Sequence, residues 1–94
     1  MTLRKFLDLC ENYDETQIAI FVGKNINDEF GSFCAKEIYK GTLLSLLEIE
    51  NNYKDVLEKP VRGWALYEEK NKNKGYTINI SILAPEIFNS VRKE

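Results

Sequence analysis

Apolar residues near the start of the chain recur at helical spacing. The positions i, i+3, i+4 and i+7 are Leu3, Phe6, Leu7 and Cys10. The residues between them are mostly charged and would face water. Thr2 precedes the stripe, and a threonine side chain can cap the first turn of a helix. The pattern predicts a helix over residues 2–11.

Two strand-like segments follow this helix. Ile18, Ile20 and Val22 alternate with other residues, which predicts a strand over residues 17–22. Residues 23–31 are rich in Gly, Asn and Asp and predict a long hairpin connection. A second strand is expected over residues 32–40, but charged residues interrupt both of its faces, which indicates a bulge or an edge position.

A leucine-rich helix is predicted between this hairpin and a second one. Gly41 and Thr42 end the strand and cap the helix, which should cover residues 43–50 with Leu43, Leu46 and Leu47 facing inward. Residues 53–57 could form another helical turn before Pro60.

The second hairpin contains the most regular alternation in the chain. Residues 61–69 predict a strand, residues 70–75 a polar hairpin tip, and residues 76–83 a strand with isoleucines on one face and polar residues on the other. Pro85 suits the first turn of a short C-terminal helix, which would bury Ile87, Phe88 and Val91.

The predicted order of elements is α-β-β-α-β-β-α, in a single α+β domain over residues 1–94. Most connections are too short for parallel crossovers. The expected architecture is therefore an antiparallel sheet of about four strands with helices packed on one face.

Composition removes several kinds of chemistry. The 94 residues contain no histidine, so mechanisms and zinc sites that need imidazole are excluded. The five glycines form neither a dinucleotide-binding nor a Walker motif. Asn25, Asn27 and Glu29 have the spacing of a calcium loop, but Phe30 and Lys36 stand where glycine and glutamate are needed. We expect a non-enzymatic protein without a cofactor or metal.

The acidic residues and the two cysteines do not change this expectation. The acidic pairs fall in predicted turns or at strand ends, where water screens them. Cys10 and Cys34 form no CxxC pair, and each falls where a small apolar residue is wanted, so reduced core thiols are expected. A disulfide between the first helix and the second strand is the alternative.

Charged residues interrupt the N-terminal apolar positions, and no apolar run reaches transmembrane length. A soluble, cytoplasmic protein with no membrane partner is expected. The net charge of −2 disfavours constitutive nucleic-acid binding but leaves room for a local basic patch.

One constellation combines basic and aromatic residues around the second hairpin. Lysines occupy the tip at positions 70, 72 and 74, and aromatic residues with Arg62 occupy the flanking strands. Single-strand binders use such lysines to hold phosphates and such aromatics to stack bases. The alternative is a solvated tip that prevents edge pairing. The candidate partner-binding residues are Trp64, Tyr67, Lys70, Lys72, Lys74 and Tyr76.

Four segments carry a resemblance to a known group of proteins. TLRKFLDLC, EIYKGTLLSLL, VRGWALY and YTINISI resemble small uncharacterised proteins of Firmicutes phages and mobile elements. The resemblance implies the helix, hairpin, G-T capped helix and hairpin pattern, and no catalytic residues. It also implies a genomic setting in which small proteins inhibit or modulate host machinery, CRISPR effectors included, and hence a location in the host cytoplasm.

The leading expectation is a protein-interaction module, in its most specific form an inhibitor of a host defence complex. One tryptophan, five tyrosines and five phenylalanines exceed what a small sheet can bury, which leaves aromatic residues such as Phe21, Tyr39 and Tyr53 as further surface candidates. The alternatives are a nucleic-acid accessory protein that uses the 70–74 tip and a symmetric homo-oligomer formed by edge pairing of the irregular second strand.

Overall fold

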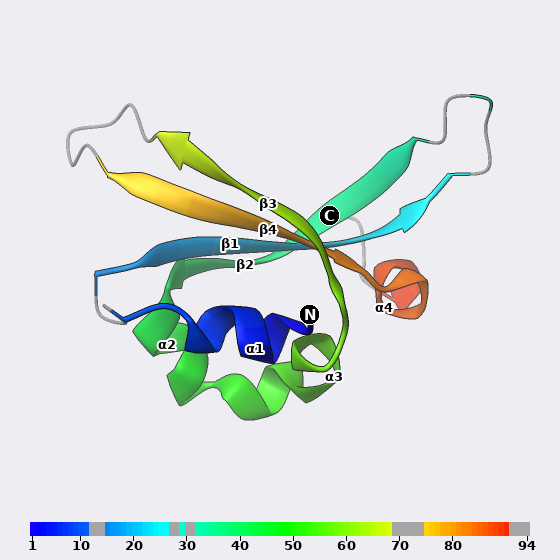
Figure 1. Ribbon diagram of the computed structural model, residues 1–94. Coiled ribbons are helices and arrows are strands. Elements are labelled where there is room, and N and C mark those ends of the chain that lie inside the picture. Colours follow the sequence, from blue (N-terminus) through cyan, green and yellow to red (C-terminus); the bar gives the residue numbers. More distant parts are fainter. Residues whose placement is uncertain (12–14, 27–28, 30–31, 69–74, 91–94) are drawn as a thin grey trace.

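The computed structural model describes residues 1–11, 15–26, 29, 32–68 and 75–90. The protein is of the α+β class, as predicted: helices precede, separate and follow two pairs of strands (Figure 1). The elements are α1 (Leu3–Asp8), β1 (Gln17–Asn25), β2 (Phe33–Thr42), α2 (Leu43–Glu48), the 3-10 helix η1 (Glu50–Tyr53), α3 (Lys54–Leu57), β3 (Val61–Glu68), β4 (Tyr76–Leu83) and α4 (Pro85–Ser90).

The four strands form one mixed sheet in the order β2-β1-β4-β3. Each hairpin is antiparallel, but the two central strands, β1 and β4, run parallel with Ile18 beside Ile78 and Ile20 beside Ile80. The expectation of a wholly antiparallel sheet is therefore wrong for the central pair. Residues 43–57 form a helical connection long enough to carry the chain from one end of the sheet to the other, so β3 begins at the end opposite to where β2 stops.

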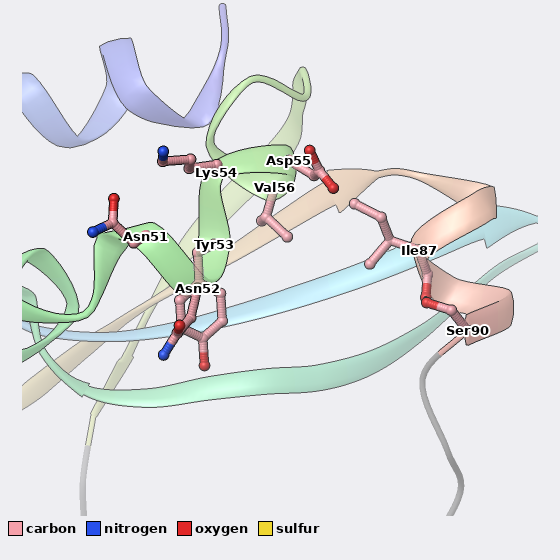
Figure 2. A pocket seen from close by; sticks show the side chains of 8 residues that line it. All are labelled: Asn51, Asn52, Tyr53, Lys54, Asp55, Val56, Ile87 and Ser90. Atoms are coloured by element: carbon pink, nitrogen blue, oxygen red, sulfur yellow. The ribbon is translucent and has the colours of Figure 1, made fainter.

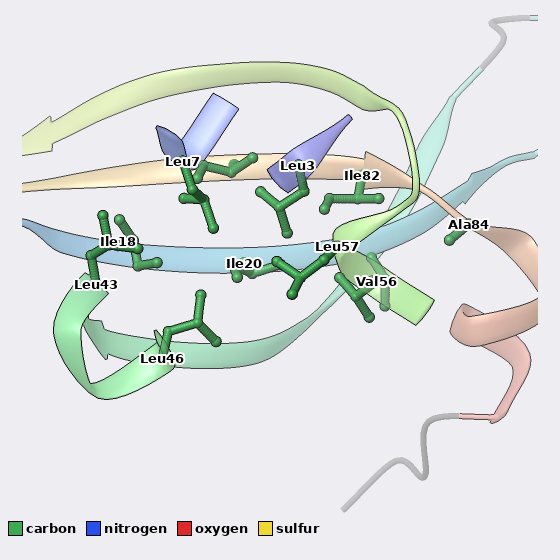
Figure 3. Packing of buried hydrophobic residues seen from close by; sticks show 12 residues of the cluster. Leu3, Leu7, Ile18, Ile20, Leu43, Leu46, Val56, Leu57, Ile82 and Ala84 are labelled. Carbon is green, nitrogen blue, oxygen red and sulfur yellow. The ribbon is translucent and has the colours of Figure 1, made fainter. Parts of the chain in front are cut away.

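The hydrophobic core lies between one face of the sheet and three helices, as predicted. We call this side, which carries Ile18, Ile20, Ile80 and Ile82, the helix face, and the opposite side the open face. Helices α1, α2 and α3 lie together beneath the helix face (Figure 1), and their apolar side chains meet the strand isoleucines (Figure 3). The helical residues in this core are Leu3, Leu7, Leu43, Leu46, Val56 and Leu57.

Two β-bulges shape the edge strands. The β1–β2 register shifts at Ile20/Phe21, opposite Tyr39 and Glu37, so Ile38 is the extra residue in β2. The sequence of β2 predicted a bulge or an edge position, and the strand has both. A second shift, between Val61 and Gly63, makes Arg62 the extra residue in β3.

Several boundaries differ from those predicted. β1 continues to Asn25 and pairs with β2 through Gly23 and Lys24, a stretch that the sequence assigned to the loop. Glycine is needed here because the ring of Phe33 occupies the space next to its Cα. Helix α1 ends at Asp8, and the turn expected over residues 53–57 is present as the last residue of η1 followed by α3.

Helix α2 begins at the predicted cap, which offers a simple stability test. The Thr42 hydroxyl accepts a hydrogen bond from the Ser45 N–H at 3.1 Å. Thr42→Ala should lower the free energy of unfolding by about 1 kcal/mol, because this N–H loses its partner at the helix start. Urea unfolding followed by circular dichroism measures the change. Thr42→Ser keeps a hydroxyl and should stay within a few tenths of the wild-type value; equal losses in both variants would contradict the role of the cap.

Candidate protein-interaction surface

The structure places three of the six predicted partner-binding residues. Trp64 and Tyr67 lie on β3 and Tyr76 begins β4, whereas Lys70, Lys72 and Lys74 lie outside the described residues. The nucleic-acid alternative depends on those three lysines, so it stays a prediction.

The three aromatic residues do not share one face of the sheet. Register pairs Trp64 with Ile80, which puts Trp64 on the helix face. Strand alternation puts Tyr76 on the same face and Tyr67 on the open face, opposite Thr77. These three residues therefore do not form a stacking platform on a single face of the sheet.

Leu66 lies on the helix face beside Trp64 and was not among the predicted partner-binding residues. It pairs with Ile78 on the helix face and is 60% exposed, comparable to Trp64 at 57%, Tyr67 at 55% and Tyr76 at 62%. The run W-A-L-Y is apolar at both odd and even positions, which is unusual for a strand with one wet face. That signal could have identified Leu66 as a surface candidate.

Helix α1 stops short of covering β3. Its Phe6 ring meets the Trp64 ring at 5.9 Å between centroids with a 53° tilt, and the remaining indole surface stays exposed. β4 lies in the interior of the sheet and β3 at its edge, so the core isoleucines are shielded while the helix-face side chains of β3 reach past the helices. We call the exposed side chains of Trp64, Leu66 and Tyr67 the β3 patch.

Among the described residues, contacts at the outer edge of β3 are made at the beginning of the strand. There, the Val61 N–H donates to the Met1 carbonyl at 2.8 Å, and Thr2 and Pro60 form an isolated antiparallel bridge. On the inner side, the Leu83 N–H donates to the Pro60 carbonyl at 3.4 Å. Before the bulge, Pro60 directs its carbonyl toward β4. The extra residue Arg62 shifts the alternation by one position, so that after the bulge the odd-numbered residues direct their backbone groups toward β4.

Beyond the bulge, backbone groups therefore alternate between β4 and the outer edge. Gly63, Ala65 and Tyr67 direct their N–H and C=O groups toward β4, and Trp64, Leu66 and Glu68 direct theirs outward. Because β3 is the last strand of the sheet, no strand among the described residues pairs with the outward groups. They form a template for one more strand, bordered by apolar side chains.

The opposite edge of the sheet is protected in several ways. β2 carries the bulge at Ile38, whose carbonyl accepts a hydrogen bond from the Tyr53 hydroxyl at 3.3 Å. Exposed Glu37 and Lys40 lie beside it. Bulges and charged side chains are the devices by which proteins discourage pairing at an edge strand.

The aromatic residues near β2 contact other residues of the same chain. Tyr39 and Tyr53 form an edge-on pair at 5.9 Å, and the Tyr39 hydroxyl donates to the Thr42 carbonyl at 2.7 Å. Burial raises the pKa of Tyr39 above its usual value. Neither ring is among the large exposed hydrophobic residues, and Phe21 is also half-buried. The three candidates from the sequence are therefore less accessible than the β3 patch.

The open face is shallow and of mixed polarity. A depression of about 240 Å³ is lined by Phe21 and Tyr67 together with Glu37, Lys40, Thr77 and Asn79. Outside this depression, the Arg62 guanidinium lies 4.0 Å from the centre of the Phe33 ring. This cation–π contact holds Arg62 against the sheet. Arg62, two residues before Trp64 in the sequence, is thus directed toward its own chain.

A second concave region lies between η1, α3 and α4. It measures about 410 Å³, and Figure 2 shows Val56 and Ile87 on its opposite sides with Asp55 and Ser90 nearby. A neighbouring ion pair joins Lys59 to Glu86, and the hydrogen bond from Lys59 lowers the pKa of the Glu86 carboxyl group. Exposed asparagines, Lys54 and the half-buried Tyr53 form the rest of the groove.

The residues with catalytic potential are dispersed. Cys10 and Cys34 are both half-buried free thiols. Burial raises the pKa of Cys10, so a smaller fraction of this thiol is the reactive thiolate at neutral pH. Within the described ranges, no three acidic or cysteine side chains are grouped so that they could hold a metal ion. Each acidic pair seen in the sequence has at least one member outside those ranges. Absence of catalysis stays a prediction.

None of the described helices has the length and apolar character required to span a membrane.

No protein-family model matches the chain, and neither a curated protein nor a solved structure shows significant similarity to it.

Proposed function

We propose that this chain is a non-enzymatic protein-interaction module that binds its partner through β3. The observation that carries the proposal is the coincidence of an unpaired strand edge with the β3 patch. A small monomer commonly scatters its exposed apolar residues, whereas contiguous ones mark interaction sites. Here Trp64 and Leu66 are neighbours on the helix face of β3, and Tyr67 extends the apolar surface of the same strand on its open face.

The chemistry of the patch fits a protein partner. Tryptophan and tyrosine are enriched among the residues that contribute most to binding free energy, and each aromatic side chain can bury roughly 150–250 Å². The contact with Phe6 restricts Trp64 in the free protein, so less side-chain entropy is lost on binding.

We further propose the more specific role of an inhibitor or modulator of a host defence complex, such as a CRISPR effector. Its support is the resemblance of the four sequence segments to small phage and mobile-element proteins. Plasmid interference by a purified or co-expressed effector is the assay for this role, and unchanged interference in the presence of the protein would count against it.

The binding role is tested by comparing variants of an affinity-tagged bait in host lysate. Trp64→Ala and Leu66→Ala should each lower the recovery of a specific partner by roughly tenfold, the loss typical of an interface hot spot. Leu44→Ala is the matched control, because Leu44 is an exposed leucine on α2, and its recovery should equal that of the wild type. Circular dichroism checks that all variants are folded. Equal recovery by all baits, or no partner with any of them, would contradict the proposal.

A further inference from the structure

We propose that the outer edge of β3 pairs with the same edge of a second copy of this chain, antiparallel and centred on Ala65. The two sheets would then join into one continuous sheet through a β3–β3 pair. This inference rests on the binding site proposed above and names its occupant.

The free part of the edge limits where a second copy can pair. The Thr2–Pro60 bridge and the Met1–Val61 hydrogen bond cover the beginning of β3, so pairing has to start after Arg62. In a register centred on Ala65, residues 63–67 of one copy lie opposite residues 67–63 of the other. Trp64 and Leu66, whose backbone groups point outward, then exchange hydrogen bonds with Leu66 and Trp64 of the second copy.

The side chains are complementary in this register. On the helix face, each Trp64 lies opposite a Leu66, and such pairs of aromatic and aliphatic residues stabilise neighbouring strands. They would extend the apolar rows of the core, since Trp64 neighbours Ile80 and Leu66 neighbours Ile78 within each chain.

On the open face, each Tyr67 lies opposite a Gly63. No atom lies within 4 Å of the position that a Cβ on Gly63 would take, so a ring from the second copy has space to cover this glycine. Ala65 meets its own copy at the symmetry axis, where a small side chain allows close approach.

The described charged residues of β3, Arg62 and Glu68, do not oppose this pairing. Arg62 is held over Phe33 of its own chain. The two copies of Glu68 lie at opposite ends of the paired segment, because antiparallel symmetry about Ala65 separates them. At the β2 edge, by contrast, the bulge and the exposed Glu37 and Lys40 disfavour the same arrangement.

The size of the interface predicts a weak dimer. The exposed parts of Trp64, Leu66 and Tyr67 amount to roughly 400 Å² per copy, so the pair buries about 800 Å² of side-chain surface. Stable complexes bury at least about 1,200 Å². We therefore expect dimers to be evident only in concentrated solution.

Sedimentation velocity over a concentration series measures this equilibrium. The wild type should shift toward the dimer with increasing concentration. Leu66→Pro should remain a monomer, because proline lacks the outward N–H while the bonds between β3 and β4 do not use it. Leu66→Lys replaces the apolar contact with a charge and should also remain a monomer, which keeps the test valid if the proline variant misfolds. Glu37→Lys on β2 is the control and should dimerise like the wild type.

Cysteine cross-linking tests the register. In a Cys10→Ala/Cys34→Ala background, Ala65→Cys would bring two Cα atoms to about 4.5 Å, within disulfide range. Under mild oxidation with glutathione disulfide, this variant should form roughly ten times more covalent dimer than Glu37→Cys in the same background, because pairing raises the effective concentration of the thiols. Equal cross-linking, or a monomer at every concentration for the wild type, would overturn the inference.

The outcomes separate this inference from the proposed function. If the wild type is always a monomer but Trp64→Ala still loses a partner from lysate, the surface binds another protein and the second copy is wrong. If dimers form through Ala65 and no other partner is recovered, the strand pairing stands and the proposed binding of a host protein fails.

Discussion

Ile80→Ala is expected to lower the free energy of unfolding by about 3–4 kcal/mol, a large part of the total stability of a domain of this size. Ile80 is completely buried on β4, with Ile20 beside it on β1 and Trp64 beside it on β3. Truncation removes three carbon atoms from the centre of the core and leaves a cavity that the paired strands cannot close without breaking their register. Urea or thermal unfolding measures the change.

The control for this variant is Ile49→Ala. Ile49 follows α2 and is 40% exposed, so the same truncation there should cost less than about 1 kcal/mol. Similar losses at the two positions would mean that β4 does not occupy the centre of the core.

Gly23→Ala is expected to destabilise the fold by about 2–3 kcal/mol, although it adds only one methyl group. That methyl carbon would lie 2.4 Å from the Cys34 carbonyl oxygen and 2.5 Å from the Phe33 ring. The ring could rotate away, but it would lose its contact with Arg62, and the carbonyl is part of the β1–β2 pair. Denaturant unfolding by circular dichroism gives the loss.

Gly63→Ala provides the matched control on β3. A Cβ at Gly63 would meet nothing within 4 Å, so the change should stay within about 0.5 kcal/mol of wild type. Both glycine variants are best compared in dilute solution, where the proposed dimer would dissociate. A Gly23 variant as stable as the Gly63 variant would contradict the close approach of β2 to β1.

The two edge strands, β2 and β3, differ in how readily they can pair with a further strand. On β2, an extra residue, a tyrosine hydroxyl and charged side chains interfere with a further strand. On β3, the bulge lies at the start of the strand and leaves the apolar stretch after it regular. Residues of one short run, W-A-L-Y, thus supply both the backbone template and the side chains of the proposed interface.

Local sequence patterns predicted most of the elements and part of the candidate site. Helical spacing, strand alternation and the Gly41-Thr42 junction depend on neighbours within a few residues, and the structure confirms the helices, the hairpins and the cap. The three described candidates, Trp64, Tyr67 and Tyr76, are exposed in the structure. Leu66 was missed because its exposure depends on where α1 ends relative to β3.

The sequence by itself determined the α+β class, the apolar faces of the helices and strands, and the irregularity of β2, because each follows from the polarity of nearby residues. Only the tertiary structure decided that β1 and β4 are parallel neighbours, that Gly23 receives the Phe33 ring, and that β3 is the edge with an uncovered apolar strand. These features depend on contacts between residues far apart in the chain, and alternation along a strand does not indicate which strand will lie beside it.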